Sequence, residues 1–249
     1  MFESDETIDD LLIDGLKLIQ KKDGFRFTID SVLLAQFATI KQGDRVVDIG
    51  TGTGIIPHIL SSRTKNIRVT GVEILADMVE MAERSVKLNG LTDVIEIIAG
   101  DLRDIHKTIG NGTATLVTAN PPYWSAGNGK PSIHQGRAIA RHELTCTFED
   151  VVICAAKLLN YQGRFAIIHR AERLLEICRL LQEHQLEPRR MQFIHSFSER
   201  PAQHVLLEAR KKAAPDLKIL PPLIVYSEQG KYTPEILKWY GKEGKIGGG

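Results

Sequence analysis

Short strand-like runs alternate with helical patterns through most of the chain, and this alternation constrains the fold more than any other feature. The strand-like runs are rich in apolar and β-branched residues and span Arg45–Ile49, Arg68–Ile74, Val94–Ala99, Ala114–Ala119 and Arg164–His169. Helical patterns lie between or after these runs at Gly54–Ser62, Ala76–Asn89, Phe148–Asn160 and Ala171–Gln185. Strand–helix–strand units of this spacing form right-handed crossovers, so we expect a parallel sheet covered by helices on both faces.

The end of the alternation predicts one reversed strand. Arg189–Phe197 and His204–Lys211 are strand-like runs with no helical pattern between them, so we expect a β-hairpin. The predicted fold class is therefore α/β, a doubly wound, seven-stranded Rossmann-like sheet with an antiparallel last strand. We expect a single domain over 1–249, made of a helical lead-in (1–44, helical over 7–40 with a turn at Asp23-Gly24), a core (45–212) and an appendage (213–249).

Composition and cysteine usage favour a cytoplasmic globular protein. The chain is 43% hydrophobic and 25% charged, which is ordinary for such proteins. No apolar run approaches the roughly 18 residues of a membrane span, and the acidic start is unlike the basic segment of a signal peptide. Cys146, Cys154 and Cys178 form no CxxC pair, which favours free thiols over a disulfide framework or a structural zinc.

Charge is uneven along the chain although the formal net charge is only +1. Residues 1–120 contain 13 Lys and Arg against 18 Asp and Glu, whereas residues 121–249 contain 19 against 13. A basic carboxyl-terminal half can present one face to a polyanion such as RNA. Uneven scatter explains the same numbers, because nucleic-acid binders usually show a denser basic cluster.

A glycine-rich turn follows the first strand, in Val47-Asp48-Ile49-Gly50-Thr51-Gly52-Thr53-Gly54-Ile55-Ile56-Pro57. Glycine there lets the backbone approach a ligand where a Cβ would collide. The dinucleotide fingerprint fails because its third glycine station falls on Ile55 or Pro57, and the Lys-Ser/Thr of a P-loop is absent. Asp48 would repel a pyrophosphate but attract the cationic amino group and sulfonium of S-adenosylmethionine, which is the expected cofactor. The alternative for Asp48 is a cap on the turn.

Two more acids end later strands. Glu73 closes the second strand 23 residues after Gly50, where an acid can accept hydrogen bonds from ribose hydroxyls. Asp101 closes the third strand, where a carboxylate can accept from the adenine amino group. Each acid has a helix-capping alternative, which is stronger for Asp101. The residues of this edge expected to contact the cofactor are Asp48, Gly50, Thr51, Gly52, Gly54, Glu73, Ile74, Asp101, Leu102 and Asn120.

The most specific motif is Asn120-Pro121-Pro122-Tyr123, directly after the fourth strand. A purine amine is a poor nucleophile, so its attack on a methyl sulfonium requires it to pyramidalise and gain positive charge. The Asn120 side-chain oxygen and the Pro121 carbonyl can accept its hydrogens and stabilise that charge, without a general base. Pro121 and Pro122 hold both acceptors rigid, and Tyr123 offers a ring for a flipped-out base. A simple strand-ending turn is the alternative.

These segments together resemble the class I, seven-stranded methyltransferases that modify adenine N6 or glutamine N5. The terminal hairpin resembles the reversed seventh strand of that group. Three flanking segments resemble the bacterial methyltransferases of adenine 37 in a valine tRNA, and these segments are Phe25–Ala35, Ala140–Glu143 and Tyr232–Glu235. The resemblance extends over most of the chain, and it implies that the lead-in contacts the cofactor through Arg26, Thr28 and Asp30.

The long basic segment Ser125–Thr147 is expected to clamp the substrate. Its alternative is a solvated surface loop, which suffices for Lys130. His142-Glu143 lacks a second histidine at helical spacing, so no metal is expected. The expected substrate contacts are Tyr123, Trp124, Arg137, Arg141 and His142. A second set of basic residues can contact phosphates or protect a sheet edge, namely Arg189, Arg190, Arg200, Arg210, Lys211 and Lys212.

The sequence thus predicts a cytoplasmic enzyme that methylates N6 of an adenine in RNA, in a tRNA anticodon loop in particular, with no membrane partner. Glutamine-N5 methylation of a release factor is one alternative. Enzymes of that group usually carry a separate N-terminal helical domain for their protein substrate, and only about 44 residues precede Arg45 here. DNA adenine methylation is another, and it lacks a recognisable target-recognition domain. A cofactor-binding RNA chaperone without turnover is the alternative outside the enzymes.

Overall fold

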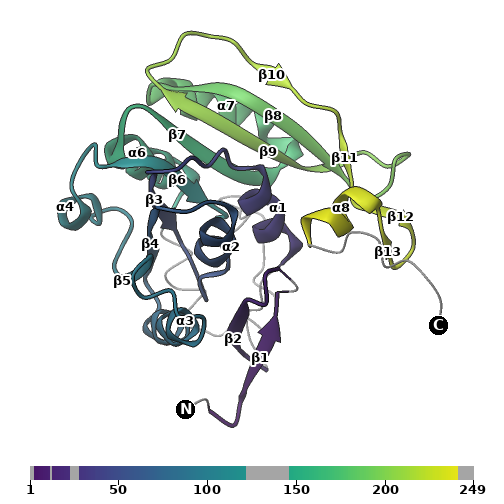
Figure 1. Ribbon diagram of the computed structural model, residues 1–249. Helices are drawn as coiled ribbons and strands as arrows, with labels where there is room; N and C mark the ends of the chain where they lie inside the picture. Colours follow the sequence, from purple (N-terminus) through teal and green to yellow (C-terminus); the bar gives the residue numbers. More distant parts are fainter. Residues whose placement is uncertain (1–2, 12, 23–27, 122–145, 241–249) are drawn as a thin grey trace.

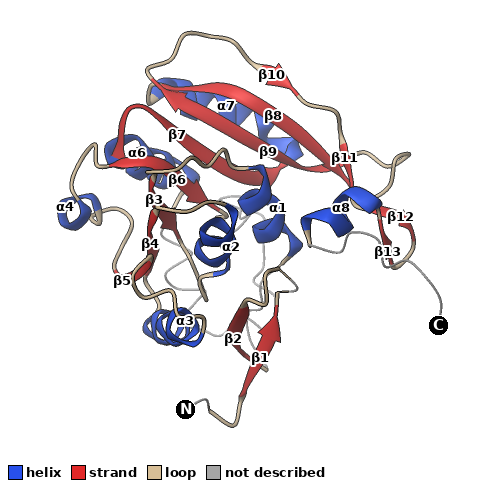
Figure 2. Ribbon diagram, viewed as in Figure 1, coloured by secondary structure: helices blue, strands red, loops and turns tan. Residues whose placement is uncertain are grey.

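The computed structural model describes residues 3–11, 13–22, 28–121 and 146–240. Its centre is a twisted sheet with helices on both faces (Figures 1 and 2). Five neighbouring strands pair in parallel, and they are β3 (Arg45–Ile49), β4 (Arg68–Glu73), β5 (Ile95–Ala99), β6 (Ala114–Ala119) and β7 (Leu159–Arg170). The strand-like runs of the sequence are confirmed as strands, with β7 extended by several residues at its start.

The predicted reversed strand is confirmed. β8 (Leu186–His195) and β9 (Ala202–Lys211) form a hairpin, and β9 lies between β7 and β8, antiparallel to both. The strand order is β10-β8-β9-β7-β6-β3-β4-β5, so the seven expected strands form the body of the sheet. Two additional two-residue strands, β10 (Lys218–Ile219) and β11 (Leu223–Ile224), pair with the outer edge of β8.

The helices divide between the two faces of the sheet. One face carries α1 (Ile29–Phe37), α2 (Ile55–Arg63) and α3 (Ala76–Leu88), and the other carries α6 (Phe148–Leu158) and α7 (Leu174–Glu183). The shorter α4 (His106–Ile109) follows β5, and a 3-10 turn (Ala171–Arg173) precedes α7.

Consecutive residues of the strands alternate between the two cores. Val46 and Leu116 pack with α1 and α2, whereas their neighbours Val47 and Val117 pack with α6 and α7. All four are at most 3% exposed, which explains why the strands are apolar on both sides. None of the described helices is long and apolar enough to span a bilayer.

The helical lead-in expected over 7–40 is wrong in its first part. β1 (Glu6–Asp10) and β2 (Lys17–Lys21) form an antiparallel hairpin, and only α1 is helical. Asp14 and Gly15 occupy the turn with φ of 50° and 70°, the left-handed pair that a type I′ turn requires. The turn expected at Asp23-Gly24 lies outside the described residues.

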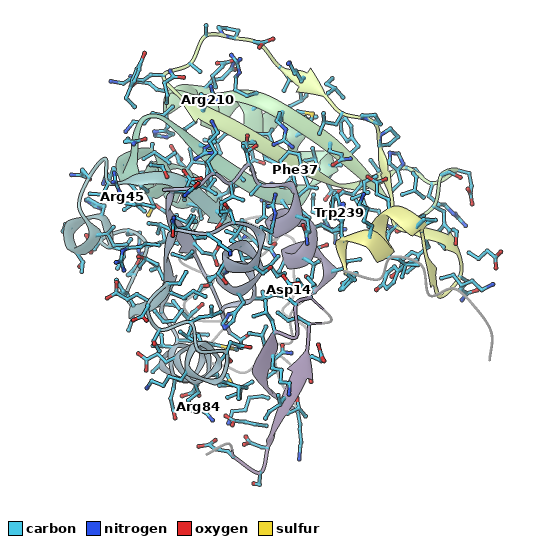
Figure 3. The ribbon with its side chains drawn as sticks, viewed as in Figure 1. Asp14, Phe37, Arg45, Arg84, Arg210 and Trp239 are labelled. Carbon is cyan, nitrogen blue, oxygen red and sulfur yellow. The ribbon has the colours of Figure 1, made fainter. Side chains whose placement is uncertain are left out.

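The hairpin packs against α3. Arg84 of α3 donates to both carboxylate oxygens of Glu6 at 2.8 and 2.5 Å, and its place beside the hairpin is seen in Figure 3. The Ile19 amide donates to Ser85 Oγ at 3.0 Å. Tertiary contacts of this kind, and not local helix propensity, determine the conformation of the segment.

The carboxyl-terminal appendage closes back on α1. β12 (Tyr226–Glu228) and β13 (Lys231–Tyr232) form a small hairpin before α8 (Pro234–Trp239). Thr233 caps α8 by accepting from the Ile236 amide, and its hydroxyl donates to the Ile224 carbonyl at 2.7 Å. Gln36 of α1 donates to the Trp239 carbonyl at 2.9 Å, where α8 meets α1 (Figure 3).

Candidate active site

The glycine-rich turn lies at the carboxyl end of β3. Gly50, Gly52 and Gly54 have φ of 69°, 57° and 87°, a left-handed region that glycine adopts without strain. The amides of Gly50 and Thr51 both donate to the Val72 carbonyl of β4, at 2.9 and 3.0 Å. The turn is therefore held against the neighbouring strand in a conformation that side chains would disfavour.

Asp48 lies beneath this turn and is completely buried. The Thr118 hydroxyl of β6 donates to its Oδ1 at 2.6 Å. Burial raises the pKa of Asp48 to about 7, although the Thr118 and Thr51 hydroxyls oppose the rise. Within the described part of the chain, Asp48 Oδ2 and Thr51 Oγ1 are buried without a well-formed hydrogen bond. Two such atoms beside a glycine turn fit a polar, cationic ligand group, which would also favour the ionised carboxylate.

Glu73 connects the turn to the end of β4. Its Oε2 accepts from the Gly52 amide at 2.9 Å, and its Oε1 accepts from the amides of Ile74 and Leu75 at 2.9 and 3.0 Å. A carboxylate has about four acceptor positions, so one on Oε2 stays available for a ribose hydroxyl. Ile74 beside it is 40% exposed and offers an apolar surface to a purine.

Asp101 follows β5 at the same edge of the sheet, but it is engaged in its own turn. Its carboxylate forms an ion pair with the Arg103 guanidinium and accepts from the Arg103 amide at 2.9 Å. The amides of Asp104 and Ile105 donate to its backbone carbonyl. Asp101 therefore closes a turn ahead of α4 and is not the N-cap of that helix, which is Ile105. A cofactor contact at Asp101, next to Leu102, would have to share the carboxylate with Arg103.

Asn120 follows β6, and its side chain reaches α1. Asn120 Nδ2 donates to Ser31 Oγ at 3.0 Å, and Ser31 is 7% exposed. Pro121 is half-buried next to it. Pro122 and Tyr123 lie outside the described residues. Of the tetrad, the structure therefore places Asn120 and Pro121, the two residues that carry the expected acceptors.

The lead-in residues Thr28 and Asp30 lie at the start of α1, three positions and one position before Ser31. Thr28 is the N-cap residue of α1, and Asp30 lies in its first turn. Burial lowers the pKa of His204 at the start of β9, and the charge of Asp30 opposes that change. Asp30 thus lies close enough to His204 for its charge to act on that ring. The remaining predicted contacts, Arg26, Trp124, Arg137, Arg141 and His142, lie outside the described residues.

The second set of basic residues is partly committed to internal contacts. Arg189 forms an ion pair with Asp216 at 2.7 Å. Arg190 lies 4.5 Å above the Phe37 ring, and Lys211 donates to the Ala156 and Leu159 carbonyls at the end of α6. These three residues therefore stabilise the fold, whatever further role they have.

Other chemistry at this edge is limited in the described part of the chain. Burial lowers the pKa of His58, whose Nδ1 lies 2.7 Å from the Gly54 carbonyl, so the ring supports the glycine turn. Cys146, Cys154 and Cys178 are free thiols. Over the described ranges, no three His, Cys, Asp or Glu side chains are grouped to hold a metal ion.

Comparisons with known proteins agree with this geometry. Residues 28–187 match the Methyltransferase small domain family. A tRNA1(Val) (adenine(37)-N6)-methyltransferase of Porphyromonas gingivalis is 30% identical over 86% of either chain. A protein of the same name from Phocaeicola vulgatus is 31% identical over 80% of this chain and 85% of that one. A predicted O-methyltransferase of Agrobacterium tumefaciens shares the fold, with a TM-score of 0.68 at 22% identity over 85% of this chain and 95% of that one.

The family match over most of the core, on a doubly wound sheet with a glycine turn and acids at its carboxyl edge, identifies a methyltransferase that uses S-adenosylmethionine. The chain belongs to the Methyltransferase small domain family, and its relatives carry the name that the sequence resemblance implied. The predicted fold class, cofactor and resemblance are confirmed.

Proposed function

We propose that the protein methylates N6 of an adenine in RNA, with a tRNA anticodon loop as the substrate, in the cytoplasm. The observation that carries the proposal is the Asn120 carboxamide after β6, with Nδ2 bound to Ser31 and Oδ1 as the acceptor end. The names of its relatives, which specify adenine 37 of a valine tRNA, support the same substrate.

In the proposed reaction, Asn120 Oδ1 and the Pro121 carbonyl accept the two hydrogens of the adenine amine. This withdraws the lone pair from the ring and stabilises the positive charge that develops on N6. Bound S-adenosylmethionine supplies an electrophilic methyl group on a sulfonium. The methylated amine then releases a proton to water, so no side chain is assigned as a general base. Tyr123 and Trp124 are proposed to stack on the flipped-out base, and Arg137, Arg141 and His142 to contact the RNA.

The cofactor is proposed to lie over the glycine turn. Asp48 holds the amino group of its methionine part, and Glu73 accepts from a ribose hydroxyl. The backbone of Gly50, Thr51, Gly52 and Gly54 forms the surface beneath it. Further contacts are assigned to Arg26, Thr28, Asp30, Ile74, Asp101, Leu102 and Asn120.

Product analysis tests this proposal. The protein is incubated with labelled S-adenosylmethionine and tRNA from cells that lack the modification, and the RNA is digested to nucleosides. We expect N6-methyladenosine with the wild type and with Asn111→Ala, an exposed asparagine in the turn before β6 and so at the opposite end of that strand from the tetrad, but not with Asn120→Ala. Label in a release factor and none in RNA would reject the adenine assignment in favour of glutamine N5. Cofactor binding without labelling of either substrate would favour a non-catalytic RNA chaperone.

A further inference from the structure

The Asn120 carboxamide has a partner that the proposed chemistry does not name. Ser31 lies 89 positions earlier in the chain, on α1, and accepts the Asn120 Nδ2 hydrogen at 3.0 Å. Its side chain is nearly inaccessible to solvent, at 7% exposure for the residue. Water therefore competes poorly for this hydrogen bond, which joins the end of β6 to the start of α1.

The orientation of a carboxamide decides what it can do to an amine. Its two ends have nearly the same shape but opposite polarity, so a half-turn of the amide replaces an acceptor by a donor. A donor facing the adenine amine would oppose the positive charge that develops there. The acceptor end must therefore face the amine before the reaction begins, because preorganised dipoles need no rearrangement at the transition state.

Ser31 is itself held firmly. Its amide donates to the Thr28 carbonyl at 3.2 Å in the first turn of α1. The next residues, Val32, Leu33 and Leu34, are at most 1% exposed and anchor the helix in the core. The backbone that carries Ser31 is therefore anchored in the core, and its side chain is not a surface group.

We propose that Ser31 is a positioning residue for methyl transfer, which anchors the Asn120 carboxamide beside α1 through Nδ2 and so holds the side chain in place at the end of β6. This inference rests on the proposed function of Asn120. It assigns a second role to α1. Its first turn would then contact the cofactor through the proposed residues Thr28 and Asp30 and also hold Asn120 through Ser31.

Ser31→Ala tests the role, since alanine keeps the helix and removes the hydroxyl. One hydrogen bond of this kind contributes about 3- to 10-fold to the rate if it acts only on the reactive orientation. We expect kcat to fall by that factor while the KM and the Kd for the cofactor stay within about twofold. Ser31→Thr, which restores a hydroxyl, recovers most of the rate. Ser62→Ala is the matched control, because the Ser62 hydroxyl donates to the Ile59 carbonyl of its own helix at 3.0 Å. We expect that variant to keep the wild-type kcat.

A measurement independent of activity separates this inference from the proposed function. In protein labelled with 15N-asparagine, the Asn120 side-chain amide is expected to shift and become more mobile in Ser31→Ala and not in Ser62→Ala. An unchanged Asn120 amide signal, or an unchanged kcat, would overturn the positioning role. So would a rise in the KM for the cofactor alone. If the wild type methylates no RNA, the proposed function fails while the amide signal still decides whether Ser31 holds Asn120. Ser31→Cys, with a weak acceptor of similar size, replaces the alanine variant if that one lowers Tm.

Discussion

Thr118 donates a 2.6 Å hydrogen bond to Asp48, and the two residues are direct neighbours in the pairing of β6 with β3. The bond connects the strand that precedes the glycine turn to the strand that precedes Asn120, the proposed catalytic residue. It also gives a buried carboxyl group, with its pKa raised to about 7, one stabilising donor. The charge state of Asp48 is therefore sensitive to its surroundings near neutral pH.

Cofactor affinity should depend on the ionisation of Asp48. Its pKa of about 7 reflects burial and the nearby charge of Glu73, and only the ionised form attracts the cationic amino group of the cofactor. We expect affinity for S-adenosylhomocysteine, which has the same amino group, to rise about tenfold from pH 6 to 8 and then level off. Calorimetric titration measures this. Asp48→Asn should bind weakly at every pH, and a wild-type affinity independent of pH would contradict the assignment.

The same pKa predicts an unusual effect on stability without the cofactor. The folded-state pKa of Asp48 lies above its ordinary value of 3.8, so the folded protein binds this proton more tightly than the unfolded chain. The contribution of Asp48 to the free energy of unfolding is therefore full at low pH and falls as the pH rises towards about 7. In urea unfolding, the free energy of unfolding of Asp48→Asn should increase relative to that of the wild type as the pH increases. A difference that is constant with pH would argue against the buried, raised-pKa carboxyl.

Gly52 and Gly90 give a matched pair of alanine substitutions. Both have left-handed φ, of 57° and 65°, and an added Cβ would meet nothing within 4 Å at either. Each substitution should cost about 1–2 kcal/mol of stability, since the backbone strain is the same. Only at Gly52 does the Cβ enter the space assigned to the cofactor, so Gly52→Ala should weaken cofactor binding at least tenfold. Equal cofactor affinities for the two variants would mean that the cofactor does not lie over this turn.

The ion pair between Glu6 and Arg84 should stabilise the amino-terminal hairpin on α3. Hydrogen bonding to Arg84 lowers the pKa of Glu6 from 4.5 to about 2, so its contribution is present above pH 4.5 and is lost as the pH falls through about 2. Glu6→Gln should cost about 1–2 kcal/mol, reduced by solvent screening of Arg84. Hydrogen exchange should show faster opening of β1 and β2. Unchanged protection of these strands would mean that the apolar contacts hold the hairpin alone.

The sequence predicted the core because each signal there is local. A five-residue run such as Arg45–Ile49 is apolar on both sides, and a buried parallel strand requires this. The hairpin of β8 and β9 followed from the missing helix between them. The amino-terminal hairpin was missed because its conformation depends on docking to Arg84 and Ser85, which are more than 60 positions away. Its only local signal was the Asp14-Gly15 pair.

The candidate site shows the same division. The position of Asp48, Glu73 and Asn120 at one edge of the sheet could be predicted, because residues at the carboxyl ends of parallel strands meet there. Thr118 and Ser31 were not predicted, because their bonds to Asp48 and Asn120 depend on which strands are neighbours and on where α1 packs. Choosing between the alternatives at Asp101 also required the structure. Arg103 lies two positions away, but the sequence does not show that the two side chains form an ion pair.

The most direct test of the central claim is the single-turnover rate of methyl transfer to a tRNA anticodon stem-loop, measured with saturating cofactor for the wild type and Asn120→Ala. The account predicts a loss of at least about 100-fold in the rate of the chemical step, the order seen when one preorganised transition-state partner is removed, with cofactor affinity within a few-fold of the wild type. An Asn120→Ala protein that methylates adenine N6 at the wild-type rate would contradict the account.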